Sequence, residues 1–192
     1  MPLVTLTSDI GHQDYLVGAI KGRLLRINPE FQIIDITHQL SPFNYPQAAY
    51  VCRSAIKNFP EFTYHIILIN LFESRPDQML FAFNRDQYIL CADNGLMGMI
   101  LEEKPEMMIG IPMEKTAIKN TLYCIDVAAK AITQLTNGAP IQNIGMPDAP
   151  YIEKNALRPL LGEDWIEGQI IFIDNFENVV VNITQEQFEQ QR

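Results

Sequence analysis

Two carboxylates in one short loop, Asp9 and Asp14, are the residues of this chain best placed to do chemistry. The loop follows an apolar strand predicted at 3–7 and leads into a helix predicted over 14–27. In open α/β sheets, ligands bind at the carboxyl ends of the strands, in loops of this kind. Asp9 is therefore expected to accept hydrogen bonds from a ligand, for instance from both hydroxyls of a ribose. The alternative is that Asp9 only caps the helix.

Histidine side chains in neighbouring loops suggest a second possible class of function. Asp9, Asp14 and His38 have the side chains of a metal-dependent hydrolase, because carboxylates and imidazoles are ligands of zinc and manganese. The spacing argues against this class, since no His-x-His, His-x-x-x-His or paired-Cys pattern occurs. His38 has the alternative of hydrogen-bonding within its loop, and His65 is expected to be packed inside a strand. We expect no metal ion and keep the metal-dependent hydrolase as an alternative.

The elements that must position these residues alternate between strands and helices. The hydrophobic pattern predicts strands at 3–7, 32–36 and 64–69, helices at 14–27 and 46–58, a hairpin with strands 79–84 and 87–91, and a last helix from about 124 to 136. Nearly continuous apolar strands joined by helical crossovers indicate a parallel sheet that is covered on both faces. The fold class is therefore predicted to be α/β.

The chain is predicted to have two parts joined by a linker. Residues 1–138 form the α/β ligand-binding domain, and 139–164 reads as a linker because it holds four prolines and little periodicity. Residues 165–192, with strands at 168–173 and 179–183, read as the beginning of a β-rich C-terminal domain. Two strands cannot bury a core. They are expected to pack on the first domain, on another subunit, or on chain absent from this sequence.

The composition argues against several partners. The formal net charge of −9 disfavours nucleic acid and anionic membranes. We find no apolar run of membrane-spanning length and no signal peptide pattern at the start. Cys52, Cys91 and Cys124 are odd in number and far apart, so they read as reduced, mostly buried thiols of a cytoplasmic protein.

Four motifs follow one another along nearly the whole chain. They are Ser8-Asp9-Ile10-Gly11 with Val17-Gly18, Ile34-Asp35-Ile36-Thr37-His38 with Pro42, Ala92-Asp93-Asn94-Gly95-Leu96, and Ile173-Asp174-Asn175-Phe176-Glu177-Asn178 with Val181-Asn182-Ile183. In this order they resemble the family of S-adenosylmethionine hydroxide adenosyltransferases and their relatives, the 5′-fluoro- and 5′-chloro-adenosine synthases. Each motif is weak alone, but four in register are specific.

The resemblance implies an α/β domain followed by a small β-barrel. It also implies a homotrimer that holds S-adenosylmethionine between the N-terminal domain of one subunit and the C-terminal domain of the next. S-adenosylmethionine would be substrate or ligand, with no further cofactor. This chain stops well before the family barrel ends, so the C-terminal domain is expected to be shortened.

The resemblance also assigns ligand contacts by position. Asp9 would hold the ribose and Phe43 would form an aromatic wall, with Asp14 and Phe72 as further candidates for ligand contact. Thr121, Leu122 and Cys124 would line the pocket beside the sulfonium. Asp174 would meet the methionine ammonium, and Phe176 and Asn178 would face the adenosine. A carboxylate suits a diol or an ammonium, and an aromatic ring suits a purine or a sulfonium.

The positions of the reacting groups depart from the family pattern. The family hydrolases activate water with an Asp, an Arg and a His, and here Asn70, Asp77 and Tyr123 stand at those places. An amide cannot accept a proton as a carboxylate does. If the chain is an enzyme, Asn70 is expected to position water while Arg75 and Tyr123 polarise it. Glu73 is the candidate to replace the missing base.

Three alternatives follow from these departures. The reaction predicted is attack of water on the 5′ carbon of S-adenosylmethionine, which releases adenosine and methionine. The main alternative is a non-catalytic homologue that binds S-adenosylmethionine or adenosine. The ligand-holding positions match the family pattern better than the positions of the reacting groups do. Halide as the nucleophile is favoured by Tyr123, which the halogenating relatives share, but Glu73 and Asp77 would repel it.

Overall fold

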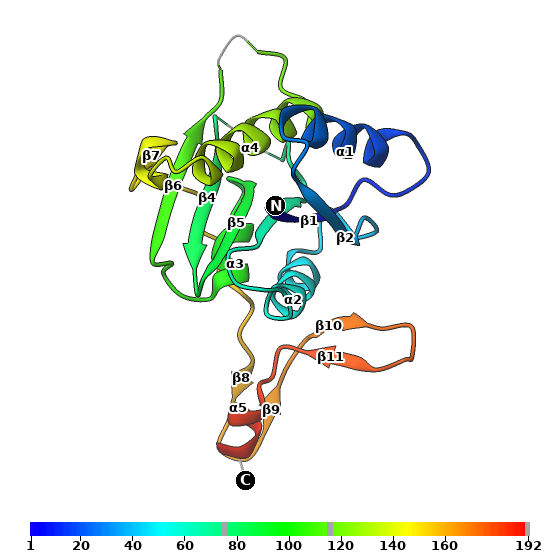
Figure 1. The fold of residues 1–192 in the computed structure, drawn as a ribbon. Coiled ribbons are helices and arrows are strands. Elements are labelled where there is room, and N and C mark those ends of the chain that lie inside the picture. Colours follow the sequence, from blue (N-terminus) through cyan, green and yellow to red (C-terminus); the bar gives the residue numbers. More distant parts are fainter. Residues whose placement is uncertain (74–76, 115–116, 191–192) are drawn as a thin grey trace. The chain divides into compact units, whose positions relative to one another are not determined.

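The computed structural model describes residues 1–73, 77–114 and 117–190, which fall into two compact units, Met1–Lys154 and Asn155–Arg192 (Figure 1). The first unit is built on a sheet of seven strands in the order β2-β1-β3-β5-β4-β6-β7. Its strands are β1 (Leu3–Ser8), β2 (Gln32–Thr37), β3 (Tyr64–Leu68), β4 (Gln78–Asn84), β5 (Gln87–Ala92), β6 (Met107–Pro112) and β7 (Met146–Pro147). Strands β2, β1, β3 and β5 are parallel, and β4 pairs antiparallel with both β5 and β6.

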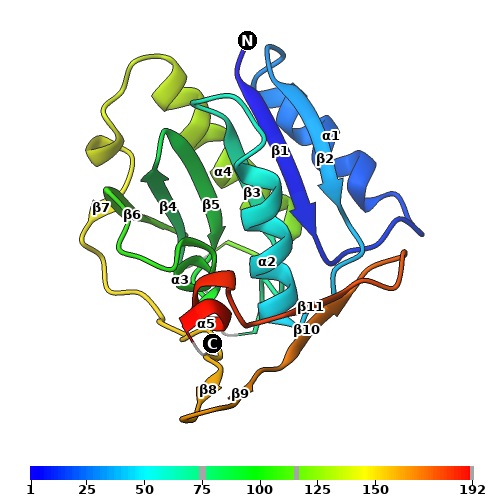
Figure 2. The ribbon, with the colours of Figure 1, turned by 90° about the horizontal axis from the view of Figure 1, so that it is seen from below.

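Helices cover both faces of this sheet. They are α1 (Leu16–Ile27) and α4 (Thr121–Thr136) on one face, and α2 (Tyr45–Ile56) and α3 (Leu96–Leu101) on the other (Figures 1 and 2). Successive side chains of β3 point to opposite faces of the sheet and contribute to both hydrophobic cores. Ile66 and Leu68 pack towards α1 and α4, whereas Ile67 packs towards α2 and α3. The predicted α/β class, its parallel strands and the 79–91 hairpin are confirmed.

Element ends differ from prediction where side chains cap the helices. Helix α4 begins at Thr121 rather than 124 because the Asn120 side chain accepts a hydrogen bond from the backbone N–H of Tyr123. Helix α2 likewise begins after Asn44, whose side chain accepts from the N–H of Gln47. Strand β6 and helix α3 are short, nearly uniform apolar segments without a diagnostic period, which is why the sequence pattern did not reveal them.

Residues 139–154, which the sequence placed in a linker, lie within the first unit. After the 3₁₀ turn Ile141–Asn143, β7 pairs antiparallel with β6, and the chain then runs to Lys154. The backbone N–H of Ile152 donates to Asp93 Oδ1 at 2.7 Å, so polar contacts tie this segment to the loop after β5.

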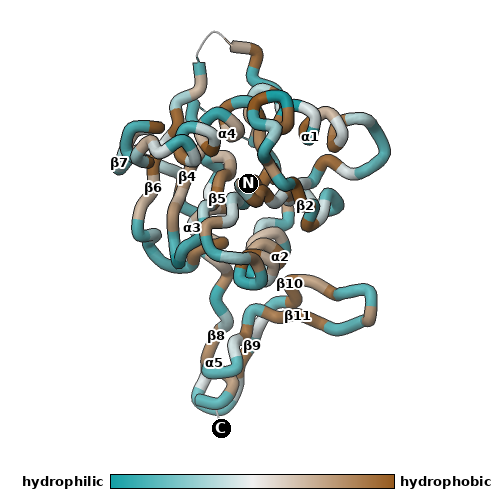
Figure 3. The backbone as a smooth tube through the Cα atoms, viewed as in Figure 1, coloured by the Kyte–Doolittle hydropathy of each residue, from teal (hydrophilic) through white to brown (hydrophobic). Residues whose placement is uncertain are grey.

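The second unit consists of short elements. Strands β8 (Leu160–Leu161) and β9 (Ile166–Glu167) form one antiparallel pair, β10 (Ile170–Ile173) and β11 (Val179–Val181) form another, and α5 (Gln185–Gln190) follows. No residue of this unit is buried among those the structure describes, and Figure 3 shows apolar stretches along its strands. The two predicted strands are present, each shorter than expected.

Other expectations from composition can be compared with the structure. Cys52, Cys91 and Cys124 are buried free thiols, as predicted. Across residues 1–73, 77–114 and 117–190, no helix is long and apolar enough to cross a membrane.

A bidentate ion pair joins the two helices on one face of the sheet. Arg23 Nε and Nη2 on α1 donate to Asp126 Oδ1 and Oδ2 on α4 at 2.9 and 2.5 Å. Because both groups are partly exposed, we expect Asp126→Asn to lower the free energy of unfolding by only about 1 kcal/mol. Urea denaturation would measure this, with exposed Asp164→Asn as the matched control. A loss equal to that of the control would show that the pair contributes nothing.

Candidate functional site

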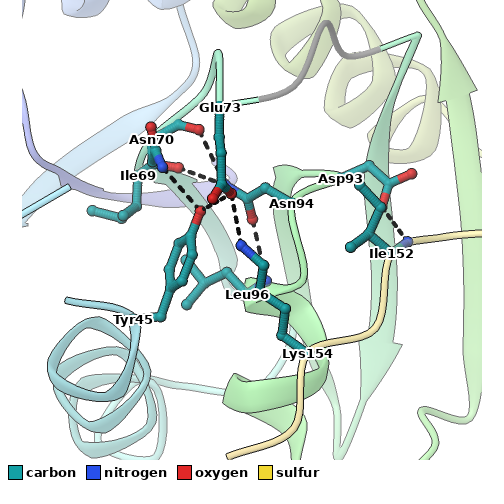
Figure 4. A network of polar contacts seen from close by, with 9 residues as sticks. All are labelled: Tyr45, Ile69, Asn70, Glu73, Asp93, Asn94, Leu96, Ile152 and Lys154. Carbon is teal, nitrogen blue, oxygen red and sulfur yellow. Dashed lines mark hydrogen bonds and ion pairs between the residues drawn. The ribbon is translucent and has the colours of Figure 1, made fainter. Parts of the chain in front are cut away.

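The carboxyl ends of three adjacent parallel strands bring polar side chains together. Strands β1, β3 and β5 end at one edge of the sheet, and the loops after them carry Asp9, Asn70 and Asn94. Asp9 Oδ2 accepts a hydrogen bond of 2.7 Å from the backbone N–H of Asn70. The amide of Asn94 donates to the backbone carbonyl oxygens of Ile69 and Asn70 at 2.9 and 3.2 Å (Figure 4). Three loops are thus joined at one point.

Asp9 is not the helix cap that the alternative interpretation required. The first turn of α1 is served by Asp14, whose Oδ1 accepts from the N–H of Leu16 at 2.8 Å. Asp9 is instead half-buried between the β1 and β3 loops, and this burial raises the pKa of its carboxyl group against the opposing effect of the Asn70 N–H. Its carboxylate retains lone pairs that can accept from a ligand hydroxyl.

Asn70 is held through both its backbone and its side chain. Its φ of 44° lies in the left-handed region, which Asn tolerates better than most residues. The side-chain amide donates to the hydroxyl of Tyr45, the first residue of α2, at 3.1 Å. The Asn70 side chain, which the resemblance predicts at the place of the family carboxylate, is therefore fixed beside a phenol, and its backbone N–H beside Asp9.

The Tyr45 hydroxyl connects Asn70 to a charged pair. It donates to Glu73 Oε2 at 2.5 Å, and Lys154 Nζ donates to the same oxygen at 2.7 Å. Lys154 Nζ also lies 4.2 Å from the centre of the Tyr45 ring. The hydrogen bonds from Lys154 and Tyr45 hold the pKa of Glu73 below its usual value. Burial, and then the Glu73 carboxylate, raise the pKa of Tyr45, so the phenol stays protonated.

The chain that delivers Lys154 is anchored along the same edge. Asp93 accepts from the Ile152 N–H and, through Oδ2, from the side-chain amide of Gln78 at 2.8 Å. Gly95 adopts φ 92°, and a Cβ there would collide with the Lys154 side chain. Glycine at this position thus allows both the turn into α3 and the close passage of the lysine.

The histidine of the adjacent loop is buried in a structural network. His38 Nδ1 lies 2.6 Å from Ser8 Oγ, and its Nε2 lies 3.3 Å from Asp35 Oδ1. Lys21 Nζ donates to Asp35 Oδ2 at 2.5 Å, and the hydrogen bonds from Lys21 and His38 outweigh burial and lower the pKa of Asp35. His38 stabilises its loop, as one of the two interpretations held. His65 is packed in β3, bonded to Thr5 Oγ1, as expected.

The metal alternative gains no geometric support. No group of three or more His, Cys, Asp and Glu side chains is gathered so as to hold a metal ion, in the part of the chain that the structure describes. The N–H of Leu16 occupies Asp14 Oδ1, and Ser8 occupies Nδ1 of His38.

The other predicted residues of the first unit lie in separate environments. Tyr123 Oη accepts from the backbone N–H of Glu114 at 2.8 Å, which connects it to the segment after β6. Thr121 and Leu122 form the first turn of α4 and are half-buried, whereas Cys124 is 1% exposed and burial raises the pKa of its thiol to about 11. These assignments stay predictions.

Two aromatic candidates face solvent. The side chains of Phe43 and Phe72 are 81% and 47% exposed, in the loops before α2 and after β3. Arg75 lies outside the described residues. Glu73, the candidate base, reaches the Asp9–Asn70 cluster through Tyr45.

Three candidates meet in the second unit. Asp174 Oδ1 accepts from the backbone N–H groups of Phe176 and Asn178 at 2.8 and 2.9 Å, and its Oδ2 accepts from the Asn178 amide at 2.8 Å. The bonds from Asn178 lower the pKa of Asp174. The turn between β10 and β11 is thereby fixed, and Phe176 projects from it at 87% exposure.

Tyr45 and Lys154 are the site residues that sequence reasoning missed. Tyr45 reads as one more apolar residue at the start of a helix. Lys154 is 81 positions from Glu73 and carries no motif. Asn94 was visible inside the Asp-Asn-Gly-Leu motif, although without a role.

Comparisons with known proteins agree with this architecture. The model of the SAM hydroxide adenosyltransferase N-terminal domain matches residues 4–145. An (R)-S-adenosyl-L-methionine hydrolase of Methanocaldococcus jannaschii is 29% identical over 97% of this chain and 69% of its own length. One of the same name from Thermus thermophilus is 27% identical over 94% of this chain and 74% of its own length.

A solved structure of an uncharacterized conserved protein from Thermotoga maritima superimposes with a TM-score of 0.83. Its sequence is 26% identical, and the match covers 98% of this chain and 74% of that one. Open α/β sheets form a class of fold that binds ligands at the carboxyl edge of the parallel strands, where this chain has its polar cluster. The chain belongs to the S-adenosylmethionine hydroxide adenosyltransferase family, as its motifs predicted.

Proposed function

We propose that this chain binds S-adenosylmethionine at the carboxyl edge of the sheet and hydrolyses it to adenosine and methionine. The observation that carries the proposal is the 2.7 Å hydrogen bond from the Asn70 backbone N–H to Asp9, which joins the loops after β1 and β3 and brings the carboxylate to the residue whose side chain would hold the water. Membership of the family and the names of its relatives support the same substrate.

Each group has a role that its chemistry permits. Asp9 accepts hydrogen bonds from the ribose hydroxyls, and the side-chain carbonyl oxygen of Asn70, Oδ1, accepts one from the attacking water. The water oxygen forms a bond to the 5′ carbon while the bond from that carbon to sulfur breaks. The electron pair goes to the sulfur of methionine, and the proton leaves for solvent or Glu73. Arg75 and Tyr123 as polarising groups, and the homotrimer, stay predictions from the resemblance.

One observation favours a binder instead. The Asn70 amide is committed to Tyr45 and cannot act as a base, so the step that needs a proton acceptor is weakened. A protein of this kind would hold S-adenosylmethionine or adenosine without turning it over.

The deciding experiment is incubation with S-adenosylmethionine, with adenosine and methionine followed by chromatography against a protein-free control. Wild type is expected to release both in equal amounts. Asp9→Asn is expected to lower the rate about 10- to 100-fold, because it removes a charge-assisted hydrogen bond. Asp164→Asn, an exposed control, should leave the rate unchanged. Binding by calorimetry without product would establish the non-catalytic alternative.

A further inference from the structure

Tyr45, Glu73 and Lys154 have the geometry of a cation-binding site with its cation in place. The Lys154 ammonium lies 4.2 Å from the centre of the Tyr45 ring and 2.7 Å from Glu73 Oε2. An aromatic face combined with a carboxylate is the arrangement by which proteins recognise ammonium and related onium groups. Figure 4 shows the lysine side chain extending towards both groups.

This arrangement is continuous with the proposed ligand site. The Tyr45 hydroxyl accepts from the Asn70 amide at 3.1 Å, and the backbone of Asn70 donates to Asp9 at 2.7 Å. A ligand whose hydroxyls bind Asp9 therefore has its remaining atoms within reach of Tyr45 and Glu73. The Glu73 carboxylate is open to a ligand, since its side chain is 41% exposed, whereas the Tyr45 ring is 9% exposed and packs in the core between α2 and α3.

Lys154 is held weakly enough to leave. Its side chain is 34% exposed, and partly exposed ion pairs contribute little to stability. A lysine stem is also flexible, so its ammonium can move to water with little cost. A cationic ligand on this face of the Tyr45 ring would take the place of the Lys154 ammonium, so the two exclude each other there.

We propose that the Tyr45 ring and the Glu73 carboxylate form a subsite for the positively charged part of the ligand, and that Lys154 competes with the ligand for it. The inference rests on the proposed function for its ligand. It adds that this chain carries an internal competitor that sets its affinity for cationic over neutral nucleosides.

Calorimetric titration with four ligands tests the inference. S-adenosylmethionine carries a sulfonium and an ammonium, S-adenosylhomocysteine an ammonium alone, and adenosine and methylthioadenosine neither. Lys154→Met keeps the stem and is expected to raise the affinity for S-adenosylmethionine about 3- to 10-fold, with adenosine unchanged. Glu73→Gln is expected to lower it about 10-fold, again with adenosine unchanged. A parallel effect on S-adenosylhomocysteine would identify the ammonium as the bound group, and its absence the sulfonium.

Matched controls are Lys104→Met and Glu61→Gln, both exposed and outside the site. Lys154→Gln provides a second variant if Lys154→Met does not fold. An affinity for S-adenosylmethionine that is unchanged or lower in the Lys154 variants, while wild type still binds it, overturns this inference alone. A lower affinity would show that Lys154 binds the ligand carboxylate. If wild type binds none of the four ligands, the proposed function falls and this inference with it.

Discussion

Replacement of Asn70 by aspartate is expected to raise the rate of S-adenosylmethionine hydrolysis by about 10²-fold or more. The substitution restores a proton acceptor at the point where the loop after β3 meets Asp9, and general base catalysis contributes about 10²- to 10⁴-fold. The gain should be large because the wild-type amide can orient water but cannot take its proton.

The surroundings of Asn70 favour the new carboxylate as a base. Aspartate tolerates the left-handed backbone at φ 44°, and the backbone bond to Asp9 is unaffected. The Tyr45 hydroxyl has one proton, so it can donate to the new carboxylate only by releasing Glu73 Oε2. The negative charges of Asp9 and Glu73 favour the uptake of a proton by this carboxylate.

Steady-state kinetics with S-adenosylmethionine would measure this gain from kcat, with adenosine as the product followed. Asn143→Asp, an exposed change outside the site, is the control for the added negative charge. A kcat for Asn70→Asp that equals the wild-type value would contradict the view that a missing base limits this chain.

Acidification from pH 6.5 to pH 4 is expected to destabilise the first unit by about 3 kcal/mol through His65 alone. His65 is 2% exposed in β3, between Thr5 Oγ1 and Gln87 Oε1, and burial lowers its pKa to about 4. In this window the unfolded chain binds a proton at His65 that the folded chain does not. The stabilisation is therefore fully present above pH 6.5 and is lost as the pH falls towards 4.

Urea unfolding at a series of pH values would show the effect as a slope of the unfolding free energy against pH. His65→Asn should flatten the dependence of the unfolding free energy between pH 6.5 and 4, whatever its stability at neutral pH. Exposed His12→Asn should keep the wild-type slope. Equal slopes for wild type and His65→Asn would mean that His65 binds its proton over the same pH range in the folded and the unfolded chain.

Local patterns were enough to predict the framework of the first unit. Strands β1, β2 and β3 and helices α1 and α2 follow from hydrophobic periodicity, which burial on one or both faces imposes. Strand β6 escaped prediction because its apolar run has no period, and residues 139–154 because a two-residue strand and a polar anchor leave no local pattern.

The candidate site was predictable only in part, for a similar reason. Asp9 lies at a strand end, where the alternation of strands and helices points to ligand binding, whereas Asn70 was predicted only through the resemblance to the family. The partnership of Tyr45 with Glu73 and Lys154 depends on contacts between residues 28 and 81 positions apart. No periodicity records such contacts, because they are set by tertiary packing.

The burial of the cysteines has a practical consequence. Cys52, Cys91 and Cys124 are each 1% exposed, and burial raises the pKa of the Cys52 thiol to about 12 and that of Cys124 to about 11. Maleimides attack thiolates, so these native side chains are shielded both sterically and by protonation. A cysteine introduced at Lys104 and another at Glu163 would therefore take up fluorophores selectively. Fluorescence energy transfer between the dyes would then measure the distance between the two units, with every native cysteine left in place.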